Sequence, residues 1–199
     1  MNSEINVLEA PVQEQVIEQP LTAGVSKWKL DGAHSSAAFS VKHMMIANVH
    51  GAFHELSGSM NLDKNDIGKS SVNVLIKSAS ITTNDAGRDQ HLKSAEFFEV
   101  EKYPEITFIS TKWGQKADDE VLVTGELTMH GVTKEVVLKA EGPTAEVKDP
   151  WGGTRVGFSA QTKINRKEFG LGWNVVLEAG GFVVGDHVTI TLEVQFVKQ

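Results

Sequence analysis

The sequence predicts an all-β fold built from antiparallel strands, and three observations lead to this prediction. Apolar and polar residues alternate with a period of two through most of the chain after Val25, the alternating runs are rich in β-branched residues, and turn-forming residues separate them. The run "SSVNVLIKSASITT" shows the pattern clearly, because Val72, Val74 and Ile76 fall on one face of an extended chain. Such a run predicts a β-strand with one face suited to a core.

The same alternation recurs along the chain and predicts about eight or nine strands. We expect them at residues 28–30, 37–41, 49–62, 72–76, 106–108, 121–129, 136–140, 156–164 and 188–196. Long antiparallel strands in simple succession pack as a sandwich or close into a barrel, and the alternation alone leaves both open. An eight-stranded barrel would have room inside for side chains or for one small ligand.

Short connections separate the expected strands. His130-Gly131 lies between two alternating runs and fits a two-residue hairpin. Asn65 and Asp66 fit a longer loop, and "DPWGG" fits a turn opened by proline. Connections of this length join strands that are antiparallel neighbours.

The stretch "ITTNDAGRDQHLKSAEFFEVEKYP" interrupts the strand pattern and predicts a short helix at 85–93. Asn84 or Asp85 can accept backbone hydrogen bonds as its N-cap, and Asp89 lies in the first turn, where a negative charge is favourable. We expect Arg88 to pair with the neighbouring carboxylates. The polar density of this stretch is thus mostly capping chemistry.

One face of this helix is predicted to close an end of the barrel. Arg88, His91 and Leu92 are three and four residues apart and can share that face. Phe97 and Phe98 cannot both point inward from an extended segment, so one is expected to cap the barrel end and the other to line its interior.

Composition excludes several function classes. The net charge of -7 and the pI near 5.5 disfavour binding to nucleic acid and to an anionic membrane face. The absence of cysteine removes disulfides, thiolate catalysis and cysteine-ligated metals. No run approaches the roughly 18 apolar residues of a transmembrane helix.

Residues 1–24 are predicted to form an acidic, solvated tail, followed by one domain over 25–199. The tail contains four glutamates and no basic residue, and it lacks the basic start and apolar middle of a secretory signal. This composition predicts a cytoplasmic protein. An alternative role for the tail is recruitment of a protein partner.

The sequence predicts neither a catalytic nor a metal site. His50 and His54 would lie about 13 Å apart on a strand at 3.3 Å per residue, too far to bind one ion. No nucleophile elbow, phosphate-binding loop or zinc-binding helix motif is present. Catalysis would require Asp85, Asp89 and His91 to converge at a cavity mouth, and this is the enzyme alternative.

Four separated segments resemble, in order and spacing, the YceI-like family. They are "WKLDGAHSSAAFSVKHMMIANVHGAF", "TTNDAGRDQHLKSAEFFEVEKYPEITFIST", "VTGELTMHGVTKEVVL" and "INRKEFGLGWN", and the resemblance extends from about Ser26 to Val197. It implies an antiparallel, lipocalin-like β-barrel of about eight strands with an elongated apolar cavity. That cavity would hold an isoprenoid or fatty amphiphile, without catalysis and with no cofactor beyond a bound prenyl quinone or similar lipid. Family members are often dimeric and often periplasmic, so the resemblance implies a homodimer and offers the periplasm as the alternative location.

The resemblance and the alternation together predict which residues contact the ligand. They are Phe39, Val41, His43, Met45, Phe53, Val74, Ile76, Arg88, His91, Leu92, Phe97, Phe98, Phe108, Leu127, Phe158, Asn165, Phe169 and Trp173. Most are apolar, because an isoprenoid tail gains affinity chiefly by leaving water.

The polar candidates would bind the head of the lipid. Lys42 beside His43, and Arg166 beside Asn165, add to this set. Cations would pair with a phosphate, whereas neutral donors suffice for a quinone carbonyl, and the sequence leaves both open. For Arg166 the alternative is a salt bridge with Glu168 or with another surface acid.

The neighbouring apolar candidates also have structural alternatives. Met44 and Met45 could form adaptable walls for the tail, although core packing is the simpler role for them. Trp173 could cover the cavity entrance or merely anchor its glycine-rich loop.

Overall fold

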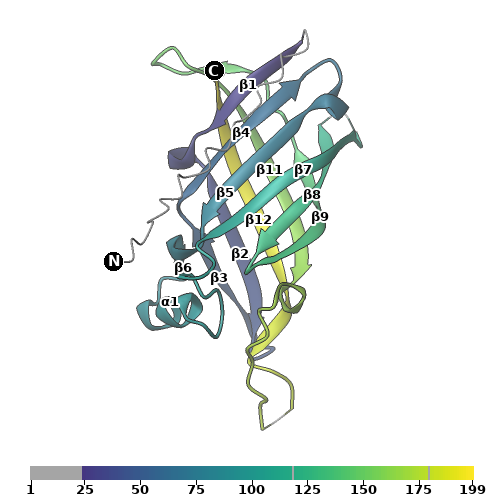
Figure 1. Ribbon diagram of the computed structural model, residues 1–199. Coiled ribbons are helices and arrows are strands. Elements are labelled where there is room, and N and C mark those ends of the chain that lie inside the picture. Colours follow the sequence, from purple (N-terminus) through teal and green to yellow (C-terminus); the bar gives the residue numbers. More distant parts are fainter. Residues whose placement is uncertain (1–23, 118, 179) are drawn as a thin grey trace, which may run out of the picture.

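The computed structural model describes residues 24–117, 119–178 and 180–199, and most of these residues form strands (Figure 1). The strands are β1 (Val25–Leu30), β2 (Ser36–His43), β3 (Ala47–Phe53), β4 (Leu56–Asp63), β5 (Ser71–Lys77), β6 (Ile81–Thr82), β7 (Glu105–Gln115), β8 (Glu120–Met129), β9 (Val132–Glu141), β10 (Val147–Lys148), β11 (Thr154–Asn165) and β12 (Val184–Lys198). The helices are α1 (Ala86–Lys93) and the short 3₁₀ turns η1 (Gly32–His34), η2 (Ile67–Lys69), η3 (Ser78–Ser80) and η4 (Arg166–Phe169). Apart from Gly24, the predicted tail lies outside the described residues.

The strands close into an antiparallel barrel. In sheet order β11, β9, β8, β7, β5, β4, β1 and β12 are neighbours, and β12 pairs with β11 to complete the ring. This closure confirms the predicted eight-stranded barrel and excludes the sandwich. Each strand of the ring therefore has a paired neighbour on both sides, although β9 meets β11 through only three residue pairs.

Three adjacent strands are broken at the same level of the barrel. β1 and β2 are separated by η1, β3 and β4 by two residues, and β5 and β6 by η3. The pairs Ala37↔Phe53 and Leu56↔Ile76 lie on either side of this level. Below this level β2, β3 and β6 continue the barrel wall. The pairs β1 and β2, β4 and β3, and β5 and β6 therefore each act as one long strand that is bent at this level, and we call the bend the crease.

The crease corrects one predicted strand. Residues 49–62 were expected to form a single strand, but β3 ends at Phe53 and β4 begins at Leu56. The backbone at the break bonds elsewhere, because the His54 N–H donates to the Ser80 hydroxyl and the Lys77 N–H donates to the Glu55 carbonyl. The inward positions therefore change from odd to even residue numbers across the break.

The predicted hairpin and helix are confirmed. His130 and Gly131 have φ of 53° and 73° and join β8 to β9 through the pair Met129↔Val132. Helix α1 has Asp85 as its N-cap, and the Asp85 carboxylate accepts a hydrogen bond from the Arg88 N–H at 2.9 Å. Within the described residues, no helix is both long and apolar enough to cross a membrane.

Side chains fill the barrel at the end where β1 lies. Trp28, Leu62 and Val156 are almost completely buried there, and the Trp28 indole N–H donates to the Ser26 hydroxyl. Figure 1 shows the chain's C-terminus at this end and α1 near the opposite one. We call these the packed end and the lower end of the barrel.

An ion-pair network ties the packed end together and allows a test of stability. Arg155 on β11 donates to Asp31 at 2.5 Å and to Asp149 at 2.7 Å. The hydrogen bond from Arg155 is the main reason why the pKa of Asp31 falls from 3.8 to about 2. A depressed folded-state pKa stabilises the protein above the unfolded pKa, and this contribution disappears as pH falls from 3.8 towards 2.

We therefore expect Asp31→Asn to lower the free energy of unfolding by about 2 kcal/mol at pH 7. The difference from the parent protein should shrink below pH 4, and urea denaturation at pH 7 and pH 3 measures both quantities. Asp66→Asn is the matched control, because Asp66 also caps a 3₁₀ turn but is exposed and asparagine can replace it as a cap. An equal loss at the two pH values would show that the network does not act through the charge of Asp31.

Candidate ligand-binding cavity

The barrel encloses an interior cavity of about 150 Å³. Its walls come from all of the long strands, and every lining residue except Thr162 is apolar. The lining comprises Ala37, Ala38, Phe39, Phe53, Leu56, Met60, Val72, Val74, Ile76, Ile106, Phe108, Trp113, Val123, Leu127, Met129, Val136, Leu138, Ala140, Phe158, Ala160, Thr162, Ile190, Leu192, Val194 and Phe196. A cavity with such walls offers water almost no hydrogen-bond partner, so it favours an apolar occupant.

Small residues at inward positions create this space. Ala37, Ala140 and Ala160 lie on neighbouring parts of the wall, where larger side chains would meet across the barrel. Gly51 and Gly125 act differently, because a Cβ at either would overlap the ring of Phe39 or Phe108. These two glycines let the rings lie against the backbone of the adjacent strand.

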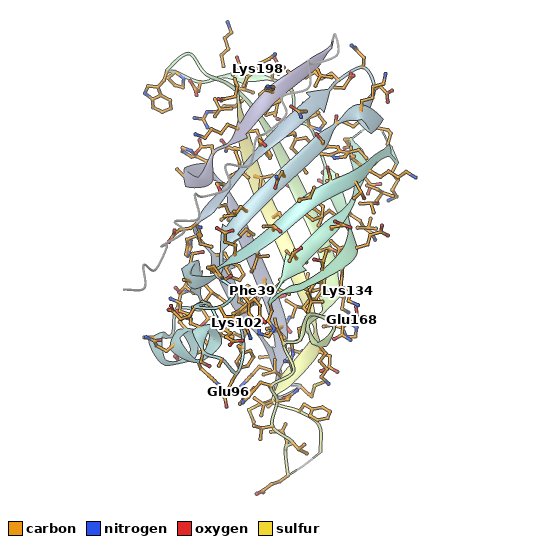
Figure 2. The ribbon with its side chains drawn as sticks, in the orientation of Figure 1. Phe39, Glu96, Lys102, Lys134, Glu168 and Lys198 are labelled. Carbon is orange, nitrogen blue, oxygen red and sulfur yellow. The ribbon has the colours of Figure 1, made fainter. Side chains whose placement is uncertain are left out.

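A second cavity, of about 170 Å³, lies at the lower end, and we call it the lower pocket. It is bounded by β2, β3 and α1, by Trp173, and by Val183 and Val184 at the start of β12. Its lining comprises Phe39, Val41, Lys42, His43, Val49, Thr83, Arg88, His91, Leu92, Phe97, Trp173, Val183 and Val184. Phe39, labelled in Figure 2, lines both cavities and therefore lies between them.

The polar groups of the lower pocket centre on Thr83. Arg88 donates from Nε to the Thr83 hydroxyl at 2.7 Å and from Nη2 to the Thr83 carbonyl at 3.0 Å. The Thr83 N–H and hydroxyl in turn donate to Asp89 at 2.7 and 2.6 Å. Burial acts to raise the pKa of Asp89, but hydrogen bonds from Thr83 and Thr82 outweigh it and the pKa is lowered. Asp89 is therefore an ionised structural anchor.

The expected pairing of Arg88 with carboxylates is wrong. Its guanidinium bonds to Thr83, whereas Asp85 caps the helix and Asp89 binds the threonines. Arg88 Nη1 has no hydrogen-bond partner among the described residues. The guanidinium thus brings a positive charge to the lower pocket without a neutralising carboxylate in contact.

Three aromatic rings form one wall of the lower pocket. His91 packs edge-on against Phe97 and Trp173, with centroid distances of 5.0 and 4.9 Å, and Phe97 lies 5.2 Å from Trp173. His91 also hydrogen-bonds Glu96, which is labelled in Figure 2, at 2.5 Å. The cluster joins α1 to the segment that begins at Trp173, so Trp173 both anchors its loop and covers the pocket.

Arg166 organises the loop on the other side of the pocket. It is 3% exposed and donates to the backbone carbonyls of four residues, at distances between 2.5 and 3.4 Å. The acceptors are Leu171, Trp173, Val184 and Gly185. Burial lowers the pKa of Arg166, and the nearby Asp186 opposes this. Arg166 does not pair with Glu168, because it is buried and turned towards these carbonyls. The acid that it approaches is Asp186, 4.0 Å from its Nη2, so the alternative of another surface acid is the one that the structure shows.

The structure brings most of the predicted contact residues to the two cavities. The interior cavity receives Phe39, Phe53, Val74, Ile76, Phe108, Leu127 and Phe158. The lower pocket receives Phe39, Val41, His43, Arg88, His91, Leu92, Phe97 and Trp173.

Four predicted contact residues line neither cavity. Asn165 caps η4, and Phe169 is 1% exposed within the core. Phe98 packs edge-on against Phe53 at 5.7 Å, so of the two adjacent phenylalanines Phe97 is the one that lines a pocket. Met45 is exposed in the turn between β2 and β3, and Met44 beside it is exposed as well, so the core-packing role expected for both is wrong.

Several lining residues were missing from the prediction. Val123 and Met129 have the same inward parity as Leu127 on β8, and Ile190 and Leu192 alternate inward on β12. Their signal was present in the alternation. Val183 and Val184 line the lower pocket only because the loop folds back, and no periodicity marks them.

The side chains that catalysis would need do not converge. Asp85 binds the helix backbone, Asp89 binds two threonines and His91 binds Glu96. Among the described residues, no group of three or more metal-ligating side chains comes together. The arrangement presents apolar walls and donors, which suit binding.

Comparison with known proteins agrees with this geometry. Residues 28–196 match the YceI-like domain model. A UPF0312 protein of Photorhabdus laumondii is 43% identical over 150 residues, covering 74% of this chain and 77% of its own length.

Solved structures share the fold. BcnA of Burkholderia cenocepacia superposes with a TM-score of 0.72 at 23% identity, covering 83% of this chain and 98% of BcnA. A polyisoprenoid-binding domain from Saccharophagus degradans superposes with a TM-score of 0.63 at 16% identity, covering 86% of this chain and 98% of that domain. With the family model matched over nearly the whole barrel, this chain belongs to the YceI-like family.

Proposed function

We propose that this protein binds a long-chain isoprenoid lipid, with the tail in the interior cavity and the head in the lower pocket, and carries or stores it without chemical change. One observation carries the proposal: a cavity with almost wholly apolar walls meets, at Phe39, a pocket lined by the cationic donors Lys42 and Arg88. The polyisoprenoid-binding domain from Saccharophagus degradans, which shares the fold, supports the same ligand class.

The interior cavity suits the tail for energetic reasons. A hydrocarbon chain gains about 25 cal/mol for each Å² of apolar surface removed from water, and it offers no group that needs a hydrogen bond. Branched methyl groups fit the uneven wall that alternating Ala and Phe side chains create. The barrel closes around the tail, so both the ligand and the wall lose contact with water.

The lower pocket suits a polar head. Lys42, His43 and Arg88 line it, and the Lys42 ammonium makes no hydrogen bond or ion pair within the described part of the chain. Thr83 and His91 also line it, but the N–H and hydroxyl of Thr83 already donate to Asp89 and the His91 Nε2 already bonds to Glu96. A phosphate would bind through the cations, and a prenyl quinone would accept hydrogen bonds at its carbonyls.

The test is to identify the ligand that travels with the protein. Purified protein should yield a long amphiphile on organic extraction, detected by mass spectrometry, and native mass spectrometry should show one lipid for each barrel. Repeated recovery of empty protein that also takes up no added prenyl quinone or polyisoprenyl phosphate would contradict the proposal.

The identity of the head group can be tested at Arg88. We expect Arg88→Gln to weaken binding of a polyisoprenyl phosphate by about tenfold or more, since a hydrogen bond to a charged group contributes roughly 1.5 to 3 kcal/mol. Binding of a prenyl quinone should change less. The quinone carbonyl is neutral, and a hydrogen bond to a neutral acceptor contributes less free energy than one to a charged phosphate. Competition between each ligand and a fluorescent lipid analogue measures the two effects.

Lys93→Gln is the matched control for that variant. Lys93 is a cation on the same helix, but it lines neither cavity. If Arg88→Gln weakened both ligands equally and lowered the melting temperature, Arg88 would act through Thr83 and not through the head group.

A further inference from the structure

An exposed apolar surface lies at the lower end of the barrel, and we call it the apolar tip. It consists of Met44, Met45 and Ile46 in the turn between β2 and β3, and of Val175, Val176 and Phe182 in the loop before β12. Their exposed fractions range from 42% at Met44 to 78% at Ile46. Figure 1 shows the loop projecting beyond the lower end of the barrel. A cluster of large apolar side chains in this position requires an explanation.

The turn between β2 and β3 is built from unfavourable residues. Met44 and Met45 have φ of 48° and 60°, and the Ile46 N–H closes the turn on the His43 carbonyl at 3.0 Å. Asparagine and glycine adopt this left-handed backbone most easily, and methionine does so at a conformational cost. Strained backbone of this kind concentrates at functional sites, which supports a role for the exposed side chains of this turn.

The two parts of the apolar tip are joined by backbone hydrogen bonds. The Met44 N–H donates to the Val183 carbonyl at 2.7 Å, and the Val183 N–H donates to the Val175 carbonyl at 3.0 Å. Val176 and Phe182 form a β-bridge across the loop. The two exposed segments are therefore held side by side at the lower end of the barrel.

The apolar tip is continuous with the lower pocket. His43 and Val183 line that pocket and adjoin the tip in the chain, and Trp173 covers the pocket just before the loop begins. A lipid with a long isoprenoid tail resides in membranes, so the route into the lower pocket starts at a bilayer. An apolar surface beside the pocket would place its mouth at that bilayer.

The charges around the apolar tip favour a neutral bilayer surface. Lys42 and Lys167 lie close to it, with the Lys167 ammonium 5.4 Å from the Phe182 ring centre. Glu178 lies in the same loop, and Asp186 pairs with Lys167 at 2.9 Å. Neither sign dominates, and long lysine side chains can extend towards headgroups while the apolar residues insert.

We propose that the apolar tip inserts into the interface of a zwitterionic phospholipid bilayer, so that the lower pocket exchanges its lipid directly with the membrane. The proposal rests on the proposed function for its purpose, because it takes the bilayer as the source of the ligand. Insertion itself depends only on the apolar tip. The contact should be largely insensitive to salt, since apolar burial drives it.

The lack of cysteine makes the test direct. Ile46→Cys and Val176→Cys each create a single labelling site in the tip, and Trp151→Cys creates the matched control, because Trp151 is 84% exposed in the turn between β10 and β11. Each full-length variant is labelled with a polarity-sensitive fluorophore and mixed with phosphatidylcholine vesicles. We expect emission to rise and shift to shorter wavelength at positions 46 and 176, and to stay unchanged at 151.

Three results would overturn the proposal. They are unchanged emission at positions 46 and 176, an equal response at position 151, and a shift at 46 and 176 that depends on protein concentration without vesicles. The last result would mean that a second copy of the chain covers the tip.

A transfer experiment separates this inference from the proposed function. We expect the double variant Ile46→Asp/Val176→Asp to take up a prenyl quinone from cyclodextrin normally, but from phosphatidylcholine vesicles at least about tenfold more slowly. The control, Val147→Asp/Trp151→Asp, carries the same charges at other exposed apolar sites and should match the parent protein. If the parent protein took up no prenyl quinone from cyclodextrin, the proposed lipid binding would be contradicted. If both double variants took up the quinone from vesicles at the same rate, docking by the apolar tip would be contradicted.

Discussion

Ala160→Phe is expected to weaken lipid binding strongly while leaving the barrel folded. Ala160 faces the interior cavity from β11. Its neighbour across the sheet is another small residue, Ala140 on β9, so the wall leaves space at this position. A phenyl ring there would fill much of the roughly 150 Å³ cavity, so the tail would have to displace packed side chains. We expect at least about a tenfold loss of affinity for a prenyl lipid. Titration with a fluorescent analogue measures the loss.

The same strand supplies the control for this variant. Gln161 is the next residue on β11 and is exposed on the outer face, because side chains alternate along a strand. Gln161→Phe adds the same ring outside the barrel and should leave binding unchanged. Full binding by Ala160→Phe, with a melting temperature equal to that of the parent, would place the tail elsewhere.

Arg166→Ala is expected to produce the largest loss of stability. The guanidinium is buried and donates to four backbone carbonyls, of which, among the described residues, only that of Val184 also accepts from another side chain, the amide of Asn174 at 2.6 Å. Leaving buried acceptors without partners costs about 1 to 3 kcal/mol for each group, partly recovered when water enters. We expect a total loss of about 3 kcal/mol, or a melting temperature lower by roughly 6 to 12 °C.

Two companion variants define what Arg166 does. Lys167→Ala removes an exposed ion pair with Asp186 and should change the stability by no more than about 1 kcal/mol. Arg166→Lys keeps a charge but cannot reach four carbonyls, and it should fall between the other two. Hydrogen exchange should increase over residues 171–185 in Arg166→Ala. A stability loss without that local change would contradict the role in organising the loop.

Much of the barrel could be predicted because strand alternation is a local property. Val72, Val74 and Ile76 all face inward on β5, because alternate residues of a strand point to the same side. The His130-Gly131 turn follows from the turn preference of these two residues. Asp85 as a helix cap is equally local. The break between Phe53 and Leu56 was missed because its cause is a bond to Ser80, far along the chain.

The candidate site divides along the same line. Inward apolar residues such as Phe108 and Leu127 were predictable, and Phe97 was predictable as one of an adjacent pair. Phe98 was misplaced because only packing against Phe53 decides which ring turns inward. Met45 continues the alternation of β2, which predicts an inward position. The chain reverses directly after His43, however, so Met45 lies in the turn and is exposed.

By itself the sequence determined that this chain forms long antiparallel strands with one apolar face, a capped helix and a family resemblance that the comparison confirmed. Only the tertiary structure decided that Arg88 bonds to Thr83 and that Arg166 is buried beneath its loop. It also decided that the turn at Met44 meets the loop at Val183. The physical reason is that alternation and capping act between neighbours in the chain, whereas ring closure brings together groups that no local pattern connects.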